Sequence, residues 1–310
     1  MNETFKIQIC FCLLFPSVLL TLALSGCGKG DTAAKLKLEH INSINLPPDG
    51  RKIPAPRSVT VAPDGKLVIL DDCGNVTVSD AEGKILKKWK MPDSRIGRPE
   101  GVCVIKDGRI AVSDTHYNRV VIFNPDGSIS NIYGSKGSAE GQFGNPVGIT
   151  QDSAENIYVS EYGEVSRVQK FTRDWKFIKS FGETGTGPGQ FQRASGLAWH
   201  EGKIYVTDAV NDRINVFSEN GDFLSCLGGE GSSCSFYLPY DLCFQGSDML
   251  VVEYGGSRIS RVGAGGELKG RFGAPGRNMG EFTTPWGIAT DSLGRIFVAD
   301  TGNRRIAVLK

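Results

Sequence analysis

The sequence predicts an all-β chain built from one repeated unit, and three observations lead to this prediction. Glycine supplies 40 of the 310 residues, nearly twice the average share of about 7%, which indicates many turns and short elements. Six segments align on one pattern and begin at Pro56, Pro99, Pro146, Ala194, Pro239 and Pro285. Their successive spacings are 43, 47, 48, 45 and 46 residues. A period in the forties that contains several short apolar runs is typical of propeller blades, so we predict a six-bladed β-propeller.

Each unit is expected to form four short strands. In the second unit the runs GVCVI, RIAVS, RVVIF and ISNIY are rich in β-branched and aromatic residues, and DG and NPDG turns separate them. The segments that lead into the next unit share a Phe three residues before the next repeat, namely Phe143, Phe191, Phe236 and Phe282. We expect this Phe to pack between neighbouring blades.

The repeat resembles a known family. The last unit, PWGIATDSLGRIFVADTGNRRIAVL, is similar to the consensus of the NHL repeat, and the resemblance covers about residues 54–310. It implies a six-bladed β-propeller. The first unit departs most from the pattern, because Asn75 stands where the other five units have Arg.

Ring closure is expected to involve the N-terminal part of the body. The last unit stops at Lys310 after its third strand, and residues 36–46, LKLEHINSINL, form a spare strand-like segment before the first unit. A ring leaves an exposed strand edge unless the two ends of the chain pair. We therefore predict that this segment supplies the outer strand of blade six; an ordered N-terminal arm is the alternative.

The first residues are expected to be a targeting signal rather than part of the fold. Residues 1–26 have a basic residue near the start, an apolar run and small residues before Cys27, which is typical of a secretory signal. The ending Leu-Ser-Gly-Cys resembles a bacterial lipobox and implies a lipid on Cys27. We expect 1–26 to be a lipoprotein signal peptide, 27–34 a lipidated tether and 35–310 the propeller, in a protein exported to the bacterial cell envelope and anchored to a membrane. An ordinary signal peptide or signal anchor is the alternative.

The net charge argues against one class of partner, and the number of cysteines limits which disulfides can form. The 35 basic and 34 acidic residues give a net charge of +1, which argues against a nucleic-acid partner recognised through a global basic field. Five cysteines follow Cys27, so they cannot all pair within one chain. Cys226 and Cys234 are the nearest-spaced candidates for a disulfide, whereas Cys103 and Cys243 are expected to be small packing residues of the inner strands.

A carboxylate ends the second strand of every unit, and five units carry an Arg five or six residues later. The carboxylates are Asp71, Asp114, Glu161, Asp208, Glu253 and Asp300. Two interpretations remain open: a structural staple that holds the hairpin, or a polar ring around one channel mouth. We expect a pair such as Asp208 with Arg213 to be a surface ion pair. Asp71 lacks its arginine, and Arg57 is available to pair with it.

The candidate binding site lies at the end of the channel where each inner strand begins. There the residues that break the repeat should converge, and such departures indicate function more strongly than consensus positions do. The predicted binding residues are Arg57, Glu100, Tyr240, Asp241, Trp286, Asp71 and Tyr254. Varied side chains on one frame suit a binding mouth; the alternative is that they only cap the channel.

We expect a binding or scaffold module whose partner is a protein, a peptide or a glycan. The alternative is a metal-assisted hydrolase or lyase at the channel mouth, in which Glu100, Asp241 and Glu253 hold a divalent cation. His40, His116 and His200 are expected in three different places, so they should not share one metal. No cofactor is expected apart from that possible cation, and no catalytic residue is assigned.

Overall fold

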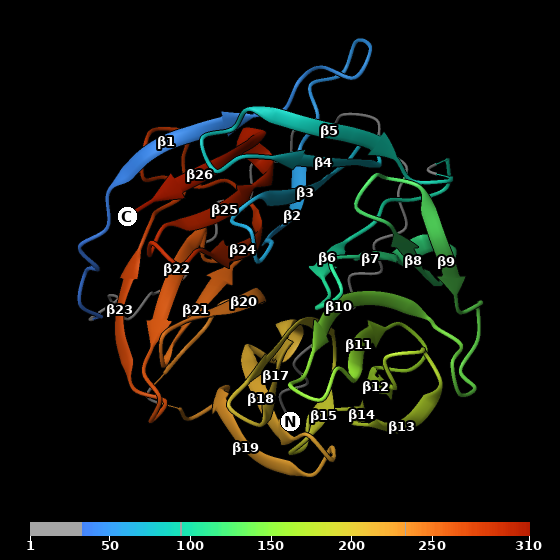
Figure 1. Cartoon of the computed structure of the whole chain (residues 1–310). Coiled ribbons are helices and arrows are strands. Elements are labelled where there is room, and N and C mark those ends of the chain that lie inside the picture. Colours follow the sequence, from blue (N-terminus) through green and yellow to red (C-terminus); the bar gives the residue numbers. More distant parts are fainter. Residues whose placement is uncertain (1–32, 94, 233) are drawn as a thin grey trace, which may run out of the picture. The chain divides into compact units, whose positions relative to one another are not determined.

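The computed structural model describes residues 33–93, 95–232 and 234–310. Six antiparallel sheets of four strands stand around a central axis, which confirms the predicted six-bladed propeller (Figure 1). Blade one consists of β2 (Pro56–Val61), β3 (Leu67–Asp71), β4 (Asn75–Ser79) and β5 (Ile85–Lys90). Blade two consists of β6 (Gly101–Val104), β7 (Ile110–Asp114), β8 (Arg119–Phe123) and β9 (Ile129–Tyr133). Blade three consists of β10 (Asn145–Gln151), β11 (Ile157–Tyr162), β12 (Arg167–Phe171) and β13 (Phe177–Phe181).

The remaining blades follow the same plan. Blade four is β16 (Ala194–His200), β17 (Lys203–Asp208), β18 (Arg213–Ser218) and β19 (Phe223–Gly228), and blade five is β20 (Pro239–Gln245), β21 (Asp248–Glu253), β22 (Arg258–Val262) and β23 (Leu268–Phe272). Blade six holds β24 (Pro285–Thr290), β25 (Ile296–Asp300) and β26 (Arg305–Leu309). Short elements complete the described chain: a parallel pair, β14 (Glu183–Thr184) with β15 (Gln190–Phe191), and the 3-10 turns Thr115–Tyr117, Ala209–Asn211 and Thr301–Asn303.

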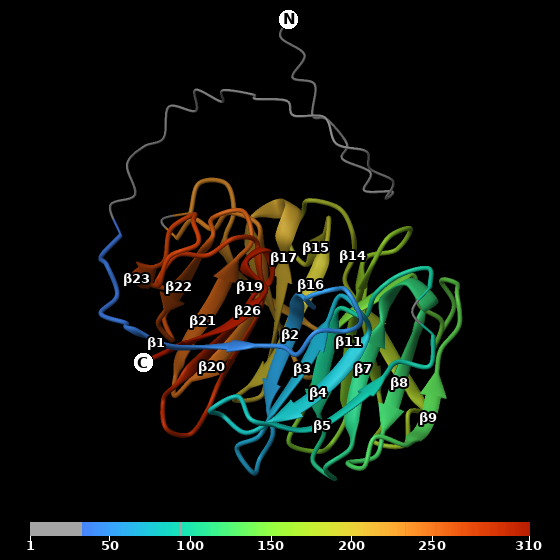
Figure 2. The ribbon, with the colours of Figure 1, turned by 90° about the horizontal axis from the view of Figure 1, so that it is seen from above.

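The N-terminal strand closes the ring, as predicted. Strand β1 (His40–Asn45) pairs antiparallel with β26, with Ile44 opposite Ile306. It runs along the outer edge of blade six (Figure 2). The chain before it also contacts blade five, because the backbone N–H of Leu36 donates to the carbonyl of Arg271 at 2.8 Å. This segment therefore covers the outer strands of two neighbouring blades.

The core lies between the blades, and the linking phenylalanines fill it. Phe143 is 1% exposed and packs with Val120 of blade two and Ile149 of blade three. Phe191, Phe236 and Phe282 occupy the same place at the next three blade interfaces. The predicted role of this Phe is confirmed.

Glycine at the third position of the repeat is explained by crowding at the axis. A Cβ on Gly148 would lie 2.6 Å from the carbonyl oxygen of Ser195 on the neighbouring inner strand. A Cβ on Gly196 would lie 2.5 Å from the Cα of Asp241. These distances are shorter than real side chains adopt, so the inner strands approach closely only because the side chain is missing.

The remaining predictions about the fold concern the N-terminal segment and the cysteines. The expected signal peptide, 1–26, and the lipid site, Cys27, lie outside the described residues. Within the described part, no helix is long and apolar enough to cross a membrane. The five cysteines after Cys27 are free thiols, so the candidate bridge between Cys226 and Cys234 is not formed.

Candidate functional site

One face of the propeller carries both the links between blades and the hairpins between second and third strands. Pro146 pairs with Glu161 and Pro239 with Glu253, so each inner strand begins where the second strand of its blade ends. We call this side the mouth face. The predicted placement of the first repeat residues near the axis on this face is correct.

A cavity of about 340 Å³ follows the axis. Residues drawn from the second to sixth positions of the aligned segments line it in every blade, and blade six contributes Trp286 and Ile288 to Thr290. At the mouth it is bounded by Arg57, Glu100, Tyr240 and Trp286, and farther in by Cys103, Asp241 and Cys243. Its volume lies in the range of about 300–1,000 Å³ typical of small-ligand sites.

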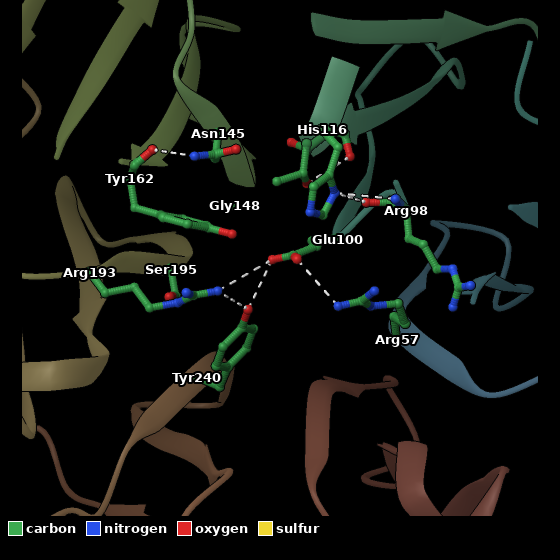
Figure 3. Close-up of polar contacts among 12 residues, drawn as sticks. Arg57, Arg98, Glu100, His116, Asn145, Gly148, Tyr162, Arg193, Ser195 and Tyr240 are labelled. Atoms are coloured by element: carbon green, nitrogen blue, oxygen red, sulfur yellow. Dashed lines mark hydrogen bonds and ion pairs between the residues drawn. The ribbon is translucent and has the colours of Figure 1, made fainter. Parts of the chain in front are cut away.

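Glu100 stands at the centre of the mouth (Figure 3). Its Oε1 accepts a hydrogen bond from Nη2 of Arg57 at 3.2 Å, and its Oε2 accepts one from the hydroxyl of Tyr240 at 2.9 Å. Nη2 of Arg193 lies 3.7 Å from the same Oε2 and donates to the Tyr240 hydroxyl at 2.8 Å. Because blades two and five face each other across the axis, the contact between Glu100 and Tyr240 spans the channel.

Aromatic rings hold both arginines of this cluster. The guanidinium carbon of Arg57 lies 3.8 Å from the centre of the Trp286 ring, and that of Arg193 lies 3.9 Å from the centre of the Tyr162 ring. Cation–π contacts of this kind are worth about 0.5–2 kcal/mol each. The planes of the two guanidinium groups are therefore fixed by their aromatic neighbours as well as by Glu100.

The aromatic residues of blades five and six also contact one another. Tyr240 and Trp286 have ring centres 4.7 Å apart, and Tyr254 lies 6.1 Å from each of them. Burial and the nearby Glu100 carboxylate raise the pKa of Tyr240. Its hydroxyl therefore stays protonated and donates to Glu100 at neutral pH.

Asp241 lies deeper than the other predicted site residues. Its Oδ1 accepts the N–H of Leu242 at 2.9 Å, and its Oδ2 accepts the N–H of Ile288 on the inner strand of blade six at 3.2 Å. Burial raises the pKa of Asp241 to about 7, although both backbone hydrogen bonds oppose the shift. This residue lines the cavity and joins two inner strands, so it belongs to the channel wall rather than to the mouth cluster.

Arg57, which was available to pair with Asp71, does not do so. Asp71 is 1% exposed, and its carboxylate accepts hydrogen bonds from the N–H groups of Cys73 and Asn75 and from the Asn75 side chain. Asn75 thus takes the place of the arginine of the other blades, and Arg57 is left to bind Glu100. Asp71 offers no accessible carboxylate at the mouth.

The other five carboxylates form structural staples. Their ion pairs with the following arginines have N–O distances of 2.7–3.0 Å, and each carboxylate side chain is at most 1% exposed. Arg213 also donates to the carbonyls of Thr186, Gly187 and Gln190 in the link from blade three. The expectation that Asp208 and Arg213 form a surface pair is wrong, because the link loop covers them.

The predicted carboxylates do not converge on a cation site. Glu100 is held by two arginines, Asp241 accepts backbone N–H groups, and Glu253 is paired with Arg258. The histidines lie apart, as expected: His40 is on β1, His116 is beside Arg98 at the mouth, and His200 is stacked on Phe244 at the end of an inner strand. Among the described residues, Asp71, Asp72 and Cys73 are the set that could approach one metal ion. Their oxygens already accept N–H groups, so we assign no site there.

Sequence reasoning missed one central member of the site. Arg193 precedes the aligned segment of blade four by one residue, and Arg98 holds the equivalent position before blade two. Arg98 reaches outward to Asp72 at 3.5 Å, whereas Arg193 reaches inward to Glu100. A comparison that extended one residue further would have found both arginines, but not their different directions.

Comparisons with known proteins agree with this architecture. A family model described as "NHL repeat" matches residues 97–123 and 282–309. The chain is a six-bladed propeller that contains NHL repeats. It is 30% identical to human NHL repeat-containing protein 3 over 131 residues, which are 40% of this chain and 36% of that protein. The chain spans less than two thirds of the length of the curated relatives that it matches.

Solved structures share the fold of this six-bladed propeller at low identity. A streptogramin B lyase matches with a TM-score of 0.62 and 16% identity, over 88% of this chain and 97% of the lyase. A nidogen/laminin complex matches with a TM-score of 0.60 and 15% identity, over 77% of this chain and 84% of the other. Enzymes and binding proteins therefore both use this frame, and at these identities the likeness shows the fold alone.

Proposed function

We propose that this propeller is a binding or scaffold module that takes a protein or peptide partner at its mouth face, in preference to a glycan. The observation that carries the proposal is a rim of exposed apolar side chains in the loops of the mouth face, the same face that carries the arginine–aromatic cluster of Arg57, Arg193, Tyr240 and Trp286. Single exposed apolar residues are ordinary on protein surfaces, but here they are distributed unevenly between the mouth face and the opposite face. The residues that are more than half exposed in mouth-face loops are Ile53, Ile96, Val210, Tyr237 and Met279.

The opposite face has a different character. Among the described residues, Leu293 is the one large apolar side chain exposed to this degree in a turn of that face. Aromatic residues, Met and Arg are enriched where proteins dock, and the mouth face carries all three kinds of residue. The central ring of the cluster, Tyr240, is 8% exposed, so it offers little surface on which a sugar ring could stack.

Cross-linking from defined positions tests this proposal. A photoreactive phenylalanine analogue replaces Tyr237 on the mouth face or Leu293 on the opposite face of the full chain, in cells that produce it. We expect adducts from position 237 that are lost when Trp286→Ala is added, and none from position 293. Adducts from position 293 alone, or from both positions equally, would contradict a mouth-face binding module.

The proposal includes export and a membrane anchor, which rest on the sequence ending Leu-Ser-Gly-Cys at Cys27. Two acyl chains give stable anchoring without a membrane-spanning segment. Replacing Cys27 with Ser should release the protein from bacterial membranes into the soluble fraction. Unchanged fractionation, together with an N-terminal peptide of unmodified mass, would overturn the anchor.

A further inference from the structure

The mouth is built as a carboxylate-binding site, and a carboxylate of the protein itself fills it. Glu100 is 6% exposed, and its two oxygens face one tyrosine hydroxyl and two guanidinium groups. Arginine and hydroxyl donors of this kind are the groups by which proteins recognise carboxylates of ligands. Their arrangement around one internal carboxylate resembles an occupied binding site.

The groups around Glu100, which are Arg57, Arg193 and the Tyr240 hydroxyl, form a cradle that offers more positive charge and more hydrogen-bond donors than Glu100 uses. Two guanidinium groups share one carboxylate, which leaves one positive charge in excess. The Nε atoms of Arg57 and Arg193 are buried and have no acceptor in the part of the chain that the structure describes. Both arginines are already fixed against the Trp286 and Tyr162 rings, so a second carboxylate would meet preorganised donors at little further entropic cost.

The position of the cluster places it where a partner would enter. Arg57 comes from blade one, Glu100 from blade two, Arg193 from the start of blade four and Tyr240 from blade five, and their contacts cross the channel axis (Figure 3). The residues of the apolar rim lie in loops of the same face. A peptide held by that rim can therefore direct an acidic side chain toward the two arginines.

We infer that the mouth binds an acidic side chain of a peptide partner between Arg57 and Arg193, and that Glu100 is an internal competitor for this site. In the free protein Glu100 occupies the cradle; in the complex the partner carboxylate takes its hydrogen bonds. No covalent step is involved. The inference rests on the proposed function, because it names the chemistry of the partner at the same face.

Calorimetric titration of the full chain with a blocked hexapeptide of glutamate, at low ionic strength, tests the inference. The variant Glu100→Gln removes the competing charge and keeps an acceptor for Tyr240. Its matched control is Glu201→Gln, which makes the same charge change at an exposed turn of the opposite face. We expect Glu100→Gln to bind the peptide at least tenfold more tightly than the wild type, Glu201→Gln to match the wild type, and Arg193→Gln to abolish the gain in the double variant.

Two further measurements keep the outcome decisive. A blocked hexapeptide of glutamine should show no gain, and sodium acetate should show a smaller gain than the glutamate peptide. Equal affinities of Glu100→Gln and Glu201→Gln would overturn the inference, and a gain with acetate as large as that with the peptide would overturn the assignment to a peptide. If Glu100→Gln does not fold, Glu100→Asp keeps every donor of the site but draws the competing carboxylate back from both arginines, and it should give a gain of about twofold; no gain would count against the inference. Failure of these titrations leaves the cross-linking result standing, so the two proposals fail separately.

Discussion

Ring closure by β1 predicts a sharp difference between two isoleucines of the same strand. Ile44 is 3% exposed and packs with Leu46, Ile306 and Val308 in the core between blades six and one, whereas Ile41 is 45% exposed. Truncation of a buried Ile to Ala costs about 2–5 kcal/mol, through lost burial and the cavity left behind. We expect Ile44→Ala to lower the free energy of unfolding by about 3 kcal/mol, because an outer strand relaxes partly around the gap.

The control is Ile41→Ala, whose side chain faces solvent and should cost under about 0.5 kcal/mol. Urea unfolding followed by tryptophan fluorescence measures both variants under the same conditions. Deletion of residues 35–46 should cost more than Ile44→Ala, since it also removes the pairing with β26. Equal stabilities of the two point variants, or an unchanged melting temperature after the deletion, would refute the closure by β1.

Three further predictions concern the staples, the channel wall and the axis. Arg213→Gln should lower the free energy of unfolding by about 3 kcal/mol because it leaves a buried carboxylate unpaired, while Lys66→Ala at an exposed pair should cost under about 0.5 kcal/mol in the same urea assay. The raised pKa of Asp241 means that the folded state holds its proton up to about pH 7. Stability relative to Asp241→Asn should therefore fall by about 2–3 kcal/mol from pH 5 to pH 8, and a constant difference would contradict the shift. Gly148→Ala should cost about 1–3 kcal/mol through overpacking, whereas Gly265→Ala, whose added Cβ meets only the end of a flexible side chain, should cost less than half as much in thermal unfolding.

The repeat made most of the fold predictable. Its period, its linking phenylalanines and the spare segment 36–46 were sufficient for the blades, their interfaces and the closure, because each depends on a pattern that recurs along the chain. Asn75 is instructive: its departure from Arg was visible in the sequence, yet its amide proved to satisfy Asp71 and so released Arg57 for another partner.

The candidate site was predictable only in part, for physical reasons. The residues that begin the inner strands all lie around the same end of the channel, because the backbone fixes their positions whatever their side chains are. The prediction that Glu100, Tyr240 and Trp286 lie together there is therefore correct. Which of them pair depends on side-chain reach across the axis, and no repeat pattern encodes this. Arg193 stands outside the aligned segment, and Asp241 turned toward the backbone of the next blade.

The affinity of the partner for mouth-face variants tests the central claim most directly. Once the cross-linked partner is identified from its adduct, its dissociation constant is measured with the wild type, with Tyr254→Ala combined with Trp286→Ala, and with Leu293→Ala. The account predicts at least a tenfold weaker complex for the mouth pair, which corresponds to about 1.4 kcal/mol, and an unchanged complex for Leu293→Ala. Loss of binding through Leu293→Ala, with the mouth pair unaffected, would contradict binding at the mouth face.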